Sequence, residues 1–190
     1  LTHAHIGHYL GLAQFGREVY AANRLPVWGS ARMRDFLSKN GPWDQLVRLN
    51  QVELRPLEPG RAVELAPGLT VTPFLVPHRD EYTDTFGFEI RGPRQSVLYV
   101  PDIDKWEKWD RSIREVADGV TYVLVDGTFA ALDELPHRDI TKVRHPLMSE
   151  TRALLRGGRA RLFFIHLNHT NPERDGRAPD IAREGMELPL

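Results

Sequence analysis

The sequence predicts an α/β domain. Short β-type runs alternate along the chain with segments of helical periodicity, as expected for a sheet covered by helices. A length of 190 residues suits a single domain spanning 1–190. The composition, 41% hydrophobic and 27% charged, is that of a globular protein large enough to bury a core. No internal repeat points to a repetitive architecture.

The first half of the chain predicts two helices among several short strands. Leu1 and Thr2 are expected to be a strand end, because a His-rich segment follows at once. A helix is predicted over 8–20, where apolar residues recur at roughly helical spacing. Ser30 is a good N-cap for a second helix over 31–39, which Gly41-Pro42 stops. The β-type runs in this half are 26–29, 52–54, 62–65 and 69–76, the last with clear period-two alternation.

The second half continues the alternation. Runs 86–90 and 96–100 flank a turn-like segment at 91–94 and predict a hairpin. Asp104 is expected to cap a helix that runs to about residue 116. A buried strand over 121–125, a helix over 149–155 and a buried strand over 161–165 follow, and the last strand ends at His166.

The composition bears on the possible partners of the protein, its metal ligands and its location. The net charge of −1 gives no electrostatic reason to expect nucleic acid or an anionic membrane as a partner. Cys is absent, so any metal must be held by His and carboxylate side chains. No apolar run could span a bilayer and no signal peptide is visible, so a cytoplasmic location is the default expectation. The chain lacks an initiating Met, and we expect it to be a fragment of a longer protein; a homodimer stays open.

Potential metal ligands follow the predicted strands one after another. In an α/β sheet, ligand sites form at the carboxyl ends of the strands, so residues far apart in sequence can meet there. His3 and His5 are two residues apart in an extended loop, and His8 begins the following helix. The remaining candidates stand at or just beyond later strand ends: His78, Asp102 and His166. Imidazole and carboxylate ligands suit zinc and iron, and such a metal lowers the pKa of its bound water toward about 7. Asp102 would bridge two metals or orient that water; its alternative role is a helix N-cap, for which Asp104 competes.

Several other polar residues lie near these strand ends, and most of them have both a functional and a purely structural interpretation. Asp126 and Thr128 follow a buried strand and either contact substrate or the groups that support the metal ligands, or they form a turn. His145 either lines the pocket or faces solvent. His169 either reaches the metal or donates a proton to a leaving group, or it is a polar loop residue. His137 lies in a charged stretch and is expected to be exposed.

The motifs resemble those of the metallo-β-lactamase superfamily. Thr2-His3-Ala4-His5-Ile6-Gly7-His8 is similar to the family's HxHxDH motif, and the strand before His78 resembles its next His motif. Phe86-Gly87-Phe88 is similar to a strand of the tRNA 3′-processing endonuclease branch. The segments that look closest to the pyrroloquinoline quinone biosynthesis protein B branch are Ile165-His166-Leu167-Asn168-His169-Thr170-Asn171-Pro172, Asp126-Gly127-Thr128-Phe129, Glu134-Leu135-Pro136 and His145-Pro146.

That resemblance implies a fold and a ligand set. The fold would be a four-layer αββα sandwich, with the N-terminal strands that normally precede the first motif absent from this chain. The first metal would be held by His3, His5 and His78. His8 and His166 would hold the second, and Asp102 would bridge the two. Gly7 stands where the family has an Asp, which leaves the second site one ligand short. One or two divalent ions are therefore expected, zinc first, with iron or manganese as alternatives.

The leading functional prediction is a metal-dependent hydrolase. A metal-bound hydroxide would attack a phosphoryl or acyl centre of a small-molecule substrate. One alternative is an iron-dependent oxidative enzyme of the quinone cofactor biosynthesis type, since Gly7 leaves room at a metal. The other alternative is a catalytically degenerate scaffold that only binds. The identity of the metal, and whether any metal binds, discriminates among the three.

Overall fold

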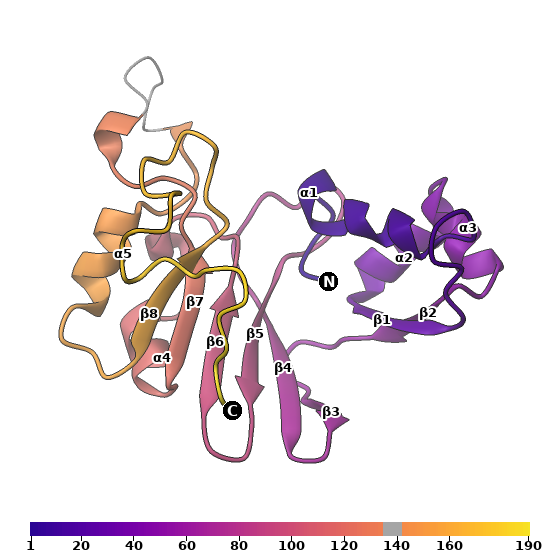
Figure 1. Ribbon diagram of the computed structural model, residues 1–190, viewed down its shortest axis with the longest axis horizontal. Coiled ribbons are helices and arrows are strands. Elements are labelled where there is room, and N and C mark those ends of the chain that lie inside the picture. Colours follow the sequence, from indigo (N-terminus) through magenta and orange to yellow (C-terminus); the bar gives the residue numbers. More distant parts are fainter. Residues whose placement is uncertain (135–141) are drawn as a thin grey trace. The chain divides into compact units, whose positions relative to one another are not determined.

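The computed structural model describes residues 1–134 and 142–190. The expectation for His137 lies outside these residues. Contacts divide the chain into two compact units: unit 1 is Leu1–Arg61 with Arg79–Phe86, and unit 2 is Ala62–His78 with Gly87–Leu190 (Figure 1). None of the described helices is both long and apolar enough to cross a bilayer.

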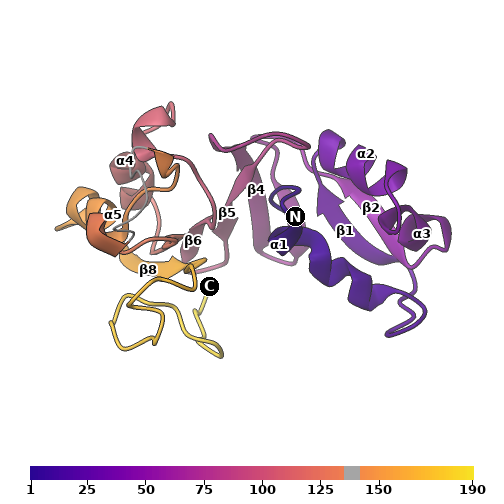
Figure 2. The ribbon, with the colours of Figure 1, turned by 90° about the horizontal axis from the view of Figure 1, so that it is seen from above.

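Unit 1 pairs a small sheet with short helices. Strands β1 (Leu25–Gly29) and β2 (Val52–Pro56) run in parallel, and helices α2 (Ala31–Lys39) and α3 (Trp43–Arg48) pack against β2 (Figure 2). Before β1, the chain forms α1 (Ile6–Tyr9) and the 3-10 helix η1 (Leu10–Phe15). The core includes Met33, Leu37 and Leu46, all buried.

Several predictions for unit 1 are confirmed and others are wrong. Ser30 caps α2, accepting a hydrogen bond from Met33 N at 3.1 Å. The helix predicted over 8–20 is wrong: it begins at Ile6, changes to a 3-10 helix and ends at Phe15, because Gly16 takes an extended conformation. Leu1 and Thr2 lie outside any strand, although Thr2 O accepts a hydrogen bond from Phe86 N at 3.1 Å. Helix α3 was not predicted, since six residues show too little periodicity.

Unit 2 is built on a six-stranded sheet whose strands lie in sequence order. Its strands are β3 (Val63–Ala66), β4 (Leu69–Leu75), β5 (Phe86–Arg91), β6 (Ser96–Val100), β7 (Tyr122–Asp126) and β8 (Arg161–Ile165). The pairs β3–β4 and β5–β6 are antiparallel, which confirms the predicted hairpin. Strands β6, β7 and β8 are parallel, so their carboxyl ends share one edge of the sheet (Figure 1).

The two faces of this sheet are covered differently. Leu98, Val123 and Phe164 belong to the main core, which also contains residues of α4 (Ile113–Asp118), α5 (Met148–Leu155) and the 3-10 helix η2 (Trp106–Lys108). Side chains of the opposite parity, Val97, Tyr122 and Phe163, pack against the C-terminal segment, drawn in yellow in Figure 1. Both faces are apolar and both are covered, as the buried strands predicted.

The helix predicted from Asp104 to about residue 116 is wrong. The structure has η2 and α4 instead, and Ser112 caps α4 by accepting from Glu115 N at 3.4 Å. Asp104 makes no cap, because its carboxylate contacts His78. The helix predicted over 149–155 is confirmed as α5, and a short 3-10 helix η3 (Leu132–Glu134) precedes the undescribed residues.

Arg152 of α5 binds the C-terminal segment of unit 2 through two carboxylates. Its Nε and Nη2 donate to Asp180 at 2.8 and 3.0 Å, and its Nη1 donates to Glu173 at 2.8 Å. The same guanidinium lies 5.1 Å from the centre of the buried Phe164 ring. The hydrogen bonds from Arg152 to Asp180, together with the charge of Arg152, outweigh the effect of burial and lower the pKa of Asp180 below its usual 3.8.

We expect Arg152→Met to lower the free energy of unfolding by about 1–2 kcal/mol, a value discounted because the side chain is 34% exposed. Asp180 stabilises the fold only while ionised, so this difference should be full above about pH 4 and shrink as the pH falls further. Urea unfolding of both proteins at pH 7 and pH 3 measures it. Arg152→Lys keeps the charge without the two-pronged geometry and should lie between them. A difference independent of pH would contradict the role given to Asp180.

Candidate metal centre

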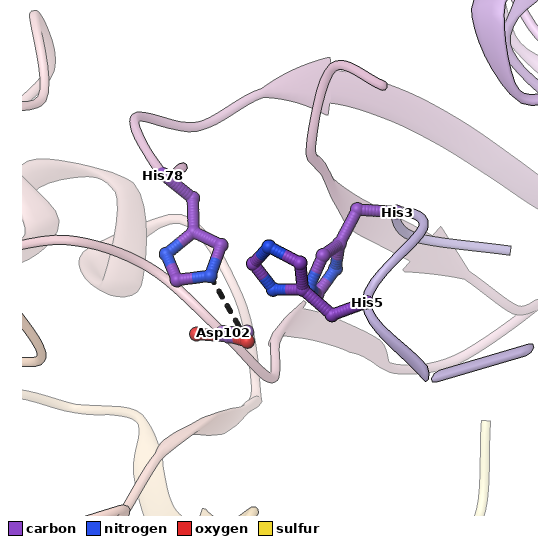
Figure 3. Close-up of side chains that lie close together, drawn as sticks. All are labelled: His3, His5, His78 and Asp102. Atoms are coloured by element: carbon purple, nitrogen blue, oxygen red, sulfur yellow. Dashed lines mark hydrogen bonds and ion pairs between the residues drawn. The ribbon is translucent and has the colours of Figure 1, made fainter. Parts of the chain in front are cut away.

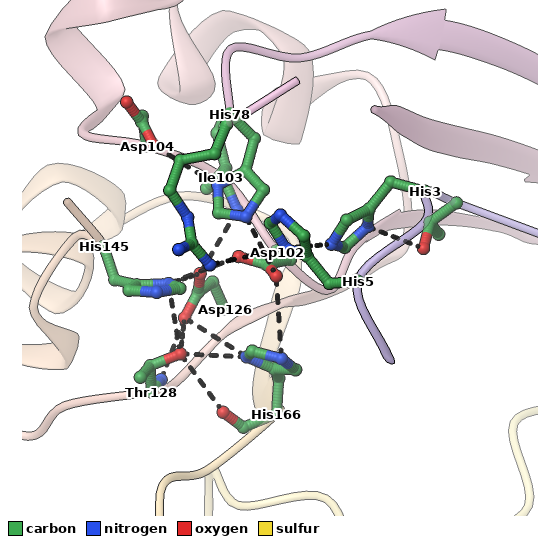
Figure 4. A network of polar contacts seen from close by, with 12 residues as sticks. His3, His5, His78, Asp102, Ile103, Asp104, Asp126, Thr128, His145 and His166 are labelled. Atoms are coloured by element: carbon green, nitrogen blue, oxygen red, sulfur yellow. Dashed lines mark hydrogen bonds and ion pairs between the residues drawn. The ribbon is translucent and has the colours of Figure 1, made fainter. Parts of the chain in front are cut away.

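The parallel strands of unit 2 deliver polar side chains to one edge. Strand β6 ends two residues before Asp102, β7 ends on Asp126, and β8 ends immediately before His166. His78 follows β4, and His145 stands on the segment that enters α5, which a bridge between Phe129 and Leu147 holds beside the strand ends. Figure 4 shows these side chains turned toward one another.

Asp102 is the common neighbour of three histidines. It is 3% exposed, and its Oδ2 lies 3.2 Å from His78 Nε2, the contact drawn in Figure 3. Its Oδ1 lies 3.3 Å from His145 Nδ1, and its Oδ2 lies 3.7 Å from His166 Nε2. The structure therefore places Asp102 among imidazoles of unit 2.

His78 is oriented by a second carboxylate. Its Nδ1 lies 3.2 Å from Asp104 Oδ1, and Lys108 Nζ donates to Asp104 Oδ2 at 3.0 Å. A carboxylate on one ring nitrogen fixes the ring and leaves the other nitrogen, here Nε2, for a ligand. From the sequence, Asp104 was expected only as a helix cap, so this role was missed. The available signal was a second Asp two residues after Asp102, which an extended segment can direct to the same place.

Asp126 is fully buried and accepts four hydrogen bonds. Its Oδ1 accepts from Thr128 N at 2.9 Å and from Thr128 Oγ1 at 2.7 Å. Its Oδ2 accepts from Ile103 N at 3.2 Å and from His145 Nδ1 at 2.8 Å. Asp126 and Thr128 thus form the expected turn, in which Thr128 N donates to the Asp126 side chain, and they also contact the histidines at the strand ends. Their contact with substrate stays a prediction.

His145 is half-buried and belongs to this cluster. Burial by itself lowers the pKa of His145, but the hydrogen bond that His145 donates to Asp126 and the charges of Asp126, Asp102 and Asp104 outweigh it, so the pKa is raised. A metal ion at these carboxylates would compete with that proton. The solvent-facing alternative for His145 does not describe this placement.

His166 occupies an unusual backbone conformation. Its φ of 59° is left-handed, which costs about 1–2 kcal/mol for a residue with a Cβ. Its Nδ1 lies 2.9 Å from Thr128 Oγ1. His169, three residues on, is exposed and belongs to neither set of potential metal ligands among the described residues.

Unit 1 contains the other candidate ligands. His3 is 1% exposed, and its Nε2 lies 2.9 Å from His5 Nδ1 (Figure 3). The rings of His3 and His8 have centroids 4.2 Å apart. His5 Nε2 lies 3.0 Å from Glu81 Oε2, a partner that sequence reasoning missed, and this hydrogen bond lowers the pKa of Glu81 to about 2. A Cβ on Gly7 would meet nothing within 4 Å, so packing alone does not require glycine there.

The donor set fits a divalent metal. Within unit 2 it combines imidazole nitrogens with two almost fully buried carboxylates, Asp102 and Asp126. Buried carboxylates need a compensating cation, and a His and carboxylate set suits zinc or iron. The cluster supports divalent metal binding but does not select the element.

Comparisons with known proteins agree with this arrangement. The family model described as "Beta-lactamase superfamily domain" matches residues 1–167. Coenzyme PQQ synthesis protein B of Nitrosococcus oceani is 31% identical over 162 residues, which cover 69% of this chain and 52% of that protein. The protein of the same name in Xanthomonas campestris pv. campestris (strain B100) is 26% identical, with 100% of this chain and 72% of its own length covered.

Solved structures show the same fold. The Zn(2+)-bound PqqB from Methylobacterium extorquens superposes with a TM-score of 0.80 at 21% identity, covering 100% of this chain and 72% of that one. A diphosphatase from the PhnP family gives 0.66 at 20% identity, covering 100% and 69%.

These comparisons confirm the predicted metallo-β-lactamase fold and the likeness to the quinone cofactor branch. The chain spans about half the length of the Nitrosococcus relative. Because the family model covers most of its length, the chain belongs to the beta-lactamase superfamily.

Proposed function

We propose that this chain carries the centre of a metal-dependent hydrolase acting on a phosphoryl or acyl small-molecule substrate. The observation that carries the proposal is the cluster at the carboxyl edge of the unit 2 sheet, where Asp102 and Asp126 are buried among His78, His145 and His166. When bound, a divalent metal lowers the pKa of a coordinated water and polarises the bond under attack. The diphosphatase and the zinc-bound protein of the same fold support this class of chemistry and metal.

The proposed ligand set follows the order of the family's motifs. His3, His5 and His78 would hold the first ion, with Asp102 shared between this ion and a second one near His166. Asp104 would keep His78 Nε2 directed at the ion through the contact at Nδ1. Asp102 would orient the attacking water, and His169, an exposed residue three positions after His166, is proposed to protonate a leaving group.

The second candidate is an oxygen-dependent oxidation with iron, and two observations favour it. The curated relatives reported above are named for synthesis of coenzyme PQQ, and Gly7 removes a ligand that the hydrolases of this fold supply. An ion with fewer protein ligands keeps more positions open for a co-substrate.

Metal removal and replacement separate the candidates. The 190-residue chain is stripped with a chelator, and turnover of a nitrophenyl phosphodiester and a nitrophenyl ester is followed after adding zinc, manganese or iron, with and without oxygen. We expect hydrolysis to vanish with the chelator and to return anaerobically with zinc or manganese. Turnover that ignores the chelator contradicts both candidates. Turnover that requires iron and oxygen favours the second, and a chain that binds no metal at micromolar concentration is a scaffold.

A further inference from the structure

Four side chains of unit 2 offer a complete set of metal ligands without help from unit 1. Asp102, Asp126, His145 and His166 each supply one ligand atom, and these atoms all lie within 4.8 Å of one another (Figure 4). Two of these residues, Asp126 and His145, have no place in the ligand set that the family's motifs imply. We call the four residues the strand-edge cluster.

The distances within the strand-edge cluster are close to those around a shared ion. Ligand atoms around a tetrahedral zinc stand about 3.3–3.6 Å apart, given metal–ligand bonds of about 2.0–2.2 Å. His145 Nδ1 lies 2.8 Å from Asp126 Oδ2 and 3.3 Å from Asp102 Oδ1. His166 Nε2 lies 3.7 Å from Asp102 Oδ2. His145 and His166 approach different oxygens of Asp102, and one ligand atom from each of the four residues lies within 4.8 Å of the other three. The side chains would therefore have to close in by about 1 Å to coordinate a shared ion.

The negative charges of the strand-edge cluster also favour a bound cation. Asp126 is 0% exposed and Asp102 is 3% exposed, and both carboxylates approach the same nitrogen of His145. Hydrogen bonds already stabilise the Asp126 carboxylate, but two buried negative charges at one nitrogen still repel each other, and a cation between them offsets that repulsion. One proton on His145 supplies a single positive charge, whereas a divalent ion in that place supplies two.

The Thr128 hydroxyl determines which ring nitrogen of His166 carries the proton. Its hydroxyl has one proton, which it donates to Asp126 Oδ1 at 2.7 Å. Toward His166 Nδ1, 2.9 Å away, the hydroxyl therefore acts as acceptor, and Nδ1 carries the proton. In a neutral imidazole Nε2 then carries the lone pair that a metal ligand needs, on the side where Asp102 lies.

We propose that the strand-edge cluster binds a divalent metal ion and replaces the second site that Gly7 has weakened. In the family's arrangement that site would use His8 and an Asp at position 7. Here unit 2 supplies Asp126 and His145 in their place. The inference deepens the proposed metal-dependent function and rests on it.

Metal stoichiometry of paired variants tests this assignment. Chelator-stripped wild type, His145→Ala and His8→Ala are titrated with zinc by calorimetry, and bound metal is counted by elemental analysis. We expect His145→Ala to bind one zinc fewer than wild type, or to bind that ion at least about a hundredfold more weakly. His8→Ala should keep the wild-type number. The reverse pattern, or a His145→Ala protein that binds like wild type, overturns the proposal.

A second variant and a second readout guard against misfolding. Asp126→Asn keeps the shape of the side chain and removes its charge, and it should lose the same ion as His145→Ala. Cobalt(II) added to wild type should give a visible spectrum with one component that disappears in both variants and persists in His8→Ala. Since these readouts do not depend on turnover, a wild type that binds the ion without hydrolysing anything refutes the proposed function and leaves the metal site standing. A wild type that binds no zinc overturns both.

Discussion

Asp102→Asn is expected to weaken metal binding by more than about a hundredfold and to remove metal-dependent turnover with it. Asp102 is almost fully buried, and its two oxygens lie within 3.2–3.7 Å of nitrogens of three histidines of unit 2. Asn has nearly the same shape but only one oxygen and no negative charge. The change therefore removes the one carboxylate that neighbours His78, His145 and His166 alike.

Zinc titration of Asp102→Asn beside Asp110→Asn measures this effect. Asp110 is an exposed residue eight positions along the chain, so its substitution changes the net charge equally and should leave zinc affinity unchanged. Circular dichroism of both proteins establishes that they fold. If Asp102→Asn binds zinc as tightly as the wild type, the metal does not bind at this cluster.

Gly127→Ala is expected to destabilise the protein by about 1–3 kcal/mol and to weaken metal binding at the same time. A Cβ on Gly127 would lie 2.8 Å from Phe164 Cβ and 3.0 Å from Ile165 O. Gly127 N also donates to Ile165 O at 2.8 Å, so the two strand ends cannot separate without losing that bond. On the other side, Asn171 Nδ2 donates to Gly127 O at 2.8 Å. Any shift would carry Asp126 and Thr128 with it.

Thermal unfolding and zinc affinity of Gly127→Ala test this expectation against Gly11→Ala. A Cβ on Gly11 would meet nothing within 4 Å, so that variant should stay within about 0.5 kcal/mol of wild type. If Gly127→Ala unfolds like Gly11→Ala and binds zinc normally, the close approach of the two strand ends does not limit the site.

Local sequence patterns were enough to predict most of the strands and the type of chemistry. Period-two alternation in 69–76 located β4, the β-type runs over 96–100 and 121–125 located β6 and β7, and the Ser30 cap located the start of α2. Ligand-type residues after successive strands indicated a metal site without thiolates, and their order indicated the family. These features depend on residues close together in the chain, which is why a linear sequence displays them.

Which polar side chains contact one another depends on the tertiary structure and could not be predicted from the sequence. Asp104 reads as a helix cap in sequence, but the chain places it on His78 Nδ1. His145 belongs to no strand end, and the bridge that holds Phe129 beside Leu147 brings it to Asp126. The helix expected over 8–20 stops at Phe15, since an apolar stripe says nothing about where the backbone turns away. Side-chain partners of this kind depend on how segments distant in sequence pack, and local patterns do not encode that packing.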